Sequence, residues 1–214
     1  MKEFPVTNVN RNSICTDVRT GKIIININTS TLLPARRYDR DLFADLIRRL
    51  IANRSGTTIL LTGTSEERAY VQQLAQRFDG NTVINVAGEW TLTRYIEELA
   101  DCELFITGDS APLHLAASMN VTTIALWGPT QPSHFGYHHA NSITSLSLNM
   151  SCSPCFVHPR SHPAVACRGA ITCMRRLTPS MIEIAALVLI NSLPSNREII
   201  FPSKYVSVAA NAFA

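Results

Sequence analysis

The stretch over residues 103–130 constrains the fold more than any other part of the chain. An apolar run breaks at Gly108, and an acid and a hydroxyl follow at Asp109 and Ser110. A short helical pattern, a second apolar run and a Gly-Pro-Thr loop come next. This order predicts strand, polar turn, helix, strand and loop. Parallel sheets place ligands at such junctions, where strands end and helices begin.

The same alternation extends through most of the sequence. Apolar runs typical of buried strands cover residues 22–28, 58–61, 82–86, 104–106, 124–127 and 143–148. Helical patterns cover 42–51, the residues after Ser65-Glu66-Glu67, 92–99, the segment around His114, and Thr178 to Ser192. The inward positions expected for the 92–99 helix are Leu92, Tyr95, Ile96 and Leu99. Strands alternating with helices predict an α/β fold with a doubly wound parallel sheet, Rossmann-like in type.

The pattern predicts one main domain over residues 22–192, with a Cys-rich loop at 150–177. Residues 1–21 carry no clear period and are interpreted as a lead-in or linker. Residues 193–214 also lack an interpretable pattern and are expected to form a C-terminal tail.

Composition narrows the class of protein. Apolar residues make up 46% of the 214 and charged residues only 16%, which is typical of a folded globule. The net charge of +3 is too small and too scattered to indicate nucleic-acid binding. The sequence has neither a signal-peptide core nor an apolar run long enough to span a membrane, so we expect a cytoplasmic protein. No GxGxxG follows the first strand, which disfavours a dinucleotide oxidoreductase.

Four segments resemble glycosyltransferase family 9, the heptosyltransferases of lipopolysaccharide core assembly. These are PARRY, LLTGTSEE, GDSAPLHLAASMNVTTIALWGPTQP, and CSPC with a later CM pair. The resemblance covers about residues 22–192 and implies the C-terminal, donor-binding half of a GT-B glycosyltransferase. The family's acidic base belongs to the other half, so no catalytic residue is assigned here. Ala111 stands where relatives usually carry glycine, and Arg36 where they carry lysine.

The resemblance implies that this domain binds ADP-heptose or a related nucleotide sugar for inverting transfer to a lipopolysaccharide core acceptor. It further implies that the acceptor is bound by a separate domain or chain and that no cofactor is required. The expected location is the cytoplasm, with or without peripheral attachment to the inner face of the membrane. The alternative interpretation is a non-catalytic nucleotide-binding module, or a truncated remnant without the acceptor domain.

The chemistry of such a transfer selects candidate residues, because negative charge grows on the departing diphosphate. Helix amides near Ser110, the side chain of His114 and the guanidinium groups of Arg36 and Arg37 can stabilise an anion, and Asp109 can bind sugar hydroxyls. Strand-end loops supply the remaining positions. The donor-binding candidates are Arg36, Arg37, Gly63, Thr64, Glu89, Thr91, Asp109, Ser110, Ala111, His114, Gly128, Pro129 and Thr130. Each also has a purely structural interpretation, as a helix cap, a core histidine, a solvated charge or a turn.

The cysteines raise a separate question. Cys152 and Cys155 form a CxxC pair, and Cys167 and Cys173 follow at a wider spacing. Four such cysteines can bind a structural zinc ion, form a disulfide, or pack as thiols under a loop. No catalytic metal is indicated by this pattern.

Overall fold

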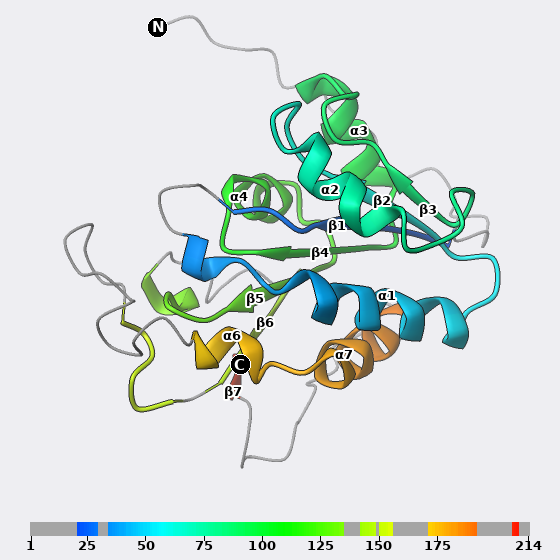
Figure 1. The fold of residues 1–214 in the computed structure, drawn as a ribbon. Coiled ribbons are helices and arrows are strands. Elements are labelled where there is room, and N and C mark those ends of the chain that lie inside the picture. Colours follow the sequence, from blue (N-terminus) through cyan, green and yellow to red (C-terminus); the bar gives the residue numbers. More distant parts are fainter. Residues whose placement is uncertain are drawn as a thin grey trace, which may run out of the picture.

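The computed structural model describes residues 21–29, 34–134, 142–148, 150–155, 171–191 and 207–209. Their strands form one sheet in the order β3-β2-β1-β4-β5-β6-β7 (Figure 1). The strands are β1 (Lys22–Asn26), β2 (Thr58–Thr62), β3 (Val83–Asn85), β4 (Leu104–Gly108), β5 (Thr123–Trp127), β6 (Ile143–Ser147) and β7 (Ser207–Ala209). The first six are parallel, and β7 pairs antiparallel with β6. The predicted α/β parallel sheet is therefore confirmed, and β7 comes from the segment expected as a tail.

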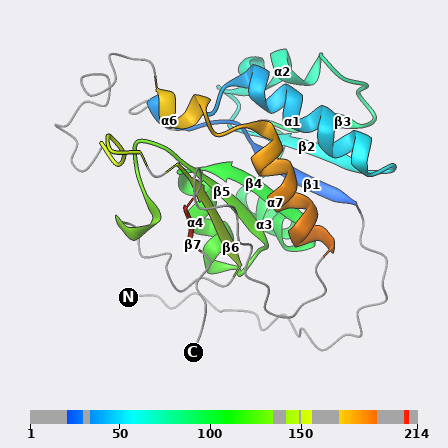
Figure 2. The ribbon, with the colours of Figure 1, turned by 90° about the horizontal axis from the view of Figure 1, so that it is seen from below.

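Helices cover both faces of the sheet (Figures 1 and 2). They are η1 (Pro34–Arg36), α1 (Arg40–Asn53), α2 (Arg68–Ala75), α3 (Leu92–Asp101), α4 (Ala111–Ser118), η2 (Pro132–His134), α6 (Thr172–Arg175) and α7 (Pro179–Asn191). Alternate residues of β1 belong to different cores: Ile23 and Ile25 pack with α1, α2 and α7, whereas Ile24 packs with α3 and α4. Because successive side chains of a strand point to opposite faces, an Ile-rich strand is buried on both sides.

Local sequence signals explain where the helices begin. The Asp39 carboxylate accepts a hydrogen bond from the Asp41 amide at the start of α1, and the Thr91 hydroxyl accepts one from the Arg94 amide at the start of α3. Both are N-caps that satisfy amides without intrahelical partners. Pro179 opens α7, as predicted, since a first-turn proline has no amide to satisfy.

One prediction about the core is wrong. Leu92 is 69% exposed and Ile96 is 36% exposed, although both were expected to face inward. The side of α3 that contacts the sheet contains Tyr95 and Leu99, and Leu99 is fully buried. Ile96 lies about 100° around the helix from Tyr95, while Leu92 lies in the first turn and lines a pocket.

The strand order 3-2-1-4-5-6 sets the position of that pocket. The chain leaves β1 through α1 to β2 on one side, and leaves β4 through α4 to β5 on the other. The two connections diverge at the carboxyl ends of β1 and β4, which is where open α/β sheets bind ligands. Among the described residues, no helix is both long and apolar enough to cross a bilayer.

Candidate functional site

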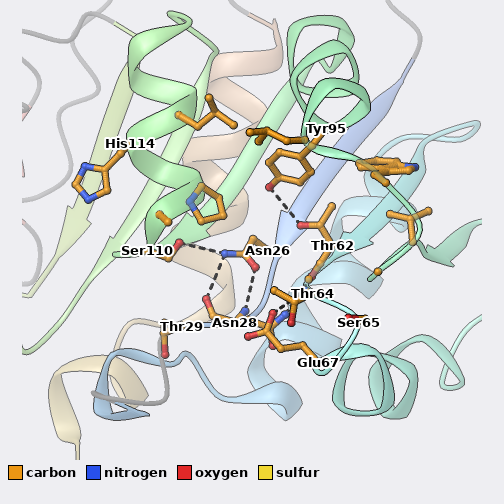
Figure 3. A pocket seen from close by; sticks show the side chains of 18 of the residues that line it. Asn26, Asn28, Thr29, Thr62, Thr64, Ser65, Glu67, Tyr95, Ser110 and His114 are labelled. Atoms are coloured by element: carbon orange, nitrogen blue, oxygen red, sulfur yellow. Dashed lines mark hydrogen bonds between the residues drawn. The ribbon is translucent and has the colours of Figure 1, made fainter. Parts of the chain in front are cut away.

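A cavity of about 870 Å³ opens at the carboxyl ends of β1, β2 and β4 (Figure 3). Its floor is polar and comes from the loops after β1 and β4: Asn26, Asn28, Thr29, Arg36, Asp109 and Ser110. Its wall is apolar and comes from the β3–α3 segment and from α4: Val86, Trp90, Leu92, Tyr95, Pro112 and Leu115. A cavity of this volume, with apolar walls and a few placed polar groups, is typical of small-molecule sites.

The Asn26 side chain joins the ends of β1 and β4. Its amide nitrogen donates to the hydroxyl oxygens of Thr107 and Ser110, each at 3.1 Å. Ser110 in turn donates to the Gly108 carbonyl at 3.2 Å. All three side chains are at most 9% exposed. The Ser110 hydroxyl therefore belongs to a buried polar network instead of capping α4.

A partly buried ion pair lies beside this network. The Arg36 guanidinium donates to Asp109 Oδ2 at 3.0 Å, and the Thr130 hydroxyl donates to the same oxygen at 2.8 Å. The Asp109 side chain is 3% exposed and that of Arg36 is 16% exposed. Asp109 and Thr130 thus position Arg36, whose guanidinium is a cation at the pocket floor.

The first turn of α4 lies at the edge of the same floor. Ala111 and His114 are exposed and line the pocket, with His114 one turn along the helix from Ser110 (Figure 3). Pro112 has no amide hydrogen, and the Leu113 amide donates to the Ser110 carbonyl at 3.0 Å. The helix therefore offers fewer first-turn amides to an anion than a helix start usually does.

The loops after β2 and β3 form the far side of the pocket. Gly63 and Thr64 line it as predicted, and so does Thr91, which caps α3. The Glu67 carboxylate also lines it and accepts from the Thr64 amide at 2.9 Å. Glu89, in contrast, is about half exposed and pairs with Arg68 on the surface, so it does not line the pocket.

Four further candidates lie outside the pocket lining. Arg37 donates to the Thr29 carbonyl and stacks over the Tyr70 ring. Gly128 packs tightly against Met174, with no room for a Cβ atom, and the Pro129 carbonyl accepts from the Cys155 amide. Thr130 contacts the site by donating its hydroxyl hydrogen to Asp109. The donor-binding role of all thirteen candidates stays a prediction.

The cysteine cluster is described only in part, because Cys167 lies outside the described residues. Cys152 is exposed, Cys155 is half-buried and Cys173 is buried. Within the described ranges, no three His, Cys, Asp or Glu side chains are grouped closely enough to hold a metal ion. The structural zinc site therefore stays a prediction.

Aromatic residues of the wall had not been predicted as site residues. The rings of Trp90 and Tyr95 lie 5.9 Å apart between centroids, and the Tyr95 hydroxyl lies 3.5 Å from the Thr62 hydroxyl. Burial raises the pKa of Tyr95 to about 12. Helical periodicity predicted Tyr95 to be buried but gave no indication that it faces a ligand cavity.

Asn26 and Asn28 were also missed as site residues, although the sequence carried a signal for them. Both interrupt an isoleucine run, KIIININ, at alternate positions near its carboxyl end. Alternate positions of a strand share a face. Two amides on one face of an otherwise apolar strand therefore indicate a polar site at its end.

Comparison with known proteins identifies the family. The family model described as glycosyltransferase family 9 (heptosyltransferase) matches residues 1–166, so this chain belongs to glycosyltransferase family 9. It is 28% identical over 181 residues to lipooligosaccharide heptosyltransferase 2 of Campylobacter jejuni, covering 82% of this chain and 54% of that protein. It is 32% identical over 110 residues to the Haemophilus ducreyi protein of the same name, covering 47% of this chain and 30% of that one.

Solved structures agree on the fold. Escherichia coli ADP-heptose lps heptosyltransferase II superposes with a TM-score of 0.63 at 20% identity, over 81% of this chain and 47% of that one. A family 9 glycosyltransferase from Veillonella parvula gives 0.61 at 20% identity, over 82% and 47%. The chain thus spans about half the length of these relatives.

We expect two carboxylate-to-amide substitutions, one in the Asp109–Arg36 pair and one in an exposed pair, to lower stability by different amounts. Asp109→Asn leaves a buried guanidinium without its counter-charge and is expected to lower the free energy of unfolding by about 3 kcal/mol. Glu89→Gln disrupts an exposed pair and is expected to cost less than about 1 kcal/mol. Urea denaturation of both variants measures the difference, and equal effects would contradict the burial argument.

Tyr95 predicts a loss of stability at alkaline pH. In the unfolded chain a tyrosine ionises near pH 10, whereas burial keeps Tyr95 protonated up to about pH 12. Between these values only the unfolded state releases the proton, so stability falls as pH rises, by up to about 1.4 kcal/mol per pH unit. Denaturation at several pH values should show a shallower decline for Tyr95→Phe than for wild type. Parallel declines would contradict this assignment.

Proposed function

We propose that this domain is the donor-binding half of a heptosyltransferase-like glycosyltransferase that holds ADP-heptose or a related nucleotide sugar. The observation that carries the proposal is the pocket at the junction of β1 and β4, with the partly buried Arg36 guanidinium on its floor and an aromatic, apolar wall. Family membership and the names of the heptosyltransferase relatives support this choice of ligand class.

The two ends of the pocket suit the two ends of a nucleoside diphosphate. Arg36 favours the negatively charged diphosphate, since a guanidinium fork binds phosphate oxygens, and α4 adds the positive end of its dipole although Pro112 removes one first-turn amide. Trp90, Leu92 and Tyr95 offer aromatic and aliphatic surface for a planar base. The sugar would then extend from the diphosphate past Asp109 and His114.

In the proposed reaction an acceptor hydroxyl attacks the anomeric carbon and ADP leaves, which inverts the configuration. Charge that develops on the departing diphosphate is stabilised by Arg36, already held in place by Asp109 and Thr130. The pocket requires no metal for this role. The base that deprotonates the acceptor is proposed to come from a separate acceptor-binding domain or chain, and the acceptor to be a lipopolysaccharide core.

The cellular setting follows from the same proposal. With a lipid-anchored saccharide as the proposed acceptor, we propose that the enzyme works in the cytoplasm, at the inner face of the membrane. Attachment there would be peripheral. A structural zinc ion at Cys152, Cys155, Cys167 and Cys173 remains a separate proposal that the transfer itself does not need.

Two substitutions test the proposed diphosphate site. Arg36→Ala and His114→Ala are each expected to weaken ADP binding by about 1 to 3 kcal/mol, the value of a lost charge-assisted hydrogen bond. Isothermal titration calorimetry measures the affinities. Arg48→Ala is the control, because Arg48 stacks over Phe78 outside the pocket lining.

The outcomes separate the possible functions. Wild-type protein that binds no ADP contradicts the proposal. Unchanged affinity in both pocket variants, at unchanged melting temperature, would leave Arg36 and His114 with structural roles only. ADP binding by a chain that transfers no sugar, even with an acceptor-binding half supplied, would favour a non-catalytic nucleotide-binding module.

A further inference from the structure

The Asn28 side chain has an oxygen that the protein leaves unused. Asn28 is 3% exposed and lines the pocket (Figure 3). Its Oδ1 atom is buried and has no hydrogen-bond partner in the described part of the chain. Buried polar atoms are nearly always satisfied, so an unsatisfied one on a residue that lines a cavity points to a ligand group. We propose that Asn28 Oδ1 accepts a hydrogen bond from a ribose hydroxyl of the bound nucleotide.

The orientation of the Asn28 amide is fixed by its other end. Asn28 Nδ2 donates to the Thr62 carbonyl at 3.1 Å. A flipped amide would bring Oδ1 against that carbonyl oxygen, and two acceptors repel each other. The unused atom is therefore the oxygen, which can only accept a hydrogen bond.

The backbone of Asn28 is held as firmly as its side chain. The Asn28 amide donates to Asn26 Oδ1 at 3.3 Å, and Asn26 Nδ2 donates back to the Asn28 carbonyl at 3.2 Å. Close packing at Gly63 adds a further restraint, since a Cβ there would lie 2.6 Å from Asn28 Nδ2. The acceptor is thus preorganised, and binding costs little additional side-chain entropy.

The chemistry of an acceptor selects a hydroxyl over a phosphate. A phosphate oxygen is itself an acceptor and would be repelled by Oδ1. Two other atoms suit the phosphate instead. Thr29 Oγ1 and Arg36 Nε are buried without a partner within the described residues, and both residues line the same pocket. The loop after β1 thus presents one acceptor beside two donors.

The position of Asn28 indicates that the hydroxyl belongs to the ribose. Asn28 is bonded to the end of β2, next to the Thr62–Tyr95 side of the wall. It is also tied through Asn26 to Ser110 on the phosphate side of the floor. A group between an aromatic wall and a phosphate site faces the ribose, because the ribose joins base and diphosphate in the ligand. This inference rests on the proposed function.

The experiment compares ADP with 2′-deoxy-ADP and 3′-deoxy-ADP by isothermal titration calorimetry. Wild type is expected to bind one of the two analogues about 3- to 10-fold more weakly than ADP, as for one net hydrogen bond. Asn28→Leu should bring that ratio to about one and leave the other analogue's ratio unchanged. Asn85→Leu is the matched control: its amide contacts Gln72 outside the pocket lining, so it should retain the wild-type ratios.

Each alternative outcome overturns the inference in an identifiable way. Wild type that binds ADP and both analogues equally contradicts it, and this comparison needs no variant to fold. Discrimination that survives in Asn28→Leu would assign the contact to another acceptor of the lining, such as the Glu67 carboxylate. Wild type that binds no ADP overturns the proposed function, and the inference with it, whereas ADP binding with unchanged ratios overturns only the inference.

Discussion

The hydrogen bonds of the Asn26 amide hold together the two strand ends on which the site depends. β1 and β4 are neighbours in the sheet, yet the chain leaves them toward opposite faces. A polar crevice in this position would leave buried groups unpaired. Asn26 satisfies these groups, because its side chain forms hydrogen bonds both with Ser110 and with the backbone of Asn28. The geometry of the floor is therefore determined before any ligand arrives.

The positive charge of Arg36 is also held in position before a ligand binds. A lone buried guanidinium would be costly, because desolvation disfavours an unpaired charge. Asp109 offsets that cost, and Thr130 shares the same carboxylate oxygen. Arg36 consequently remains on the floor as a positioned cation. A site of this kind stabilises developing negative charge without reorganising during the reaction.

The sequence predicted the sheet well because hydrophobic periodicity and strand–helix alternation are local signals. It placed Asp109, Ser110 and His114 at one strand end for the same reason. It failed where tertiary packing decides the outcome. Leu92, which was expected to face inward, is instead exposed in the first turn of α3. The thirteen donor-binding assignments, the zinc site and the domain limits stay predictions.

The central claim is that the crevice between β1 and β4 holds a nucleoside diphosphate. A crystal structure of this domain grown with ADP tests it most directly. The account predicts the diphosphate within hydrogen-bond distance of Arg36 and the first turn of α4, with the base against Trp90 and Tyr95. Density for ADP elsewhere on the domain, with this pocket empty, would contradict it.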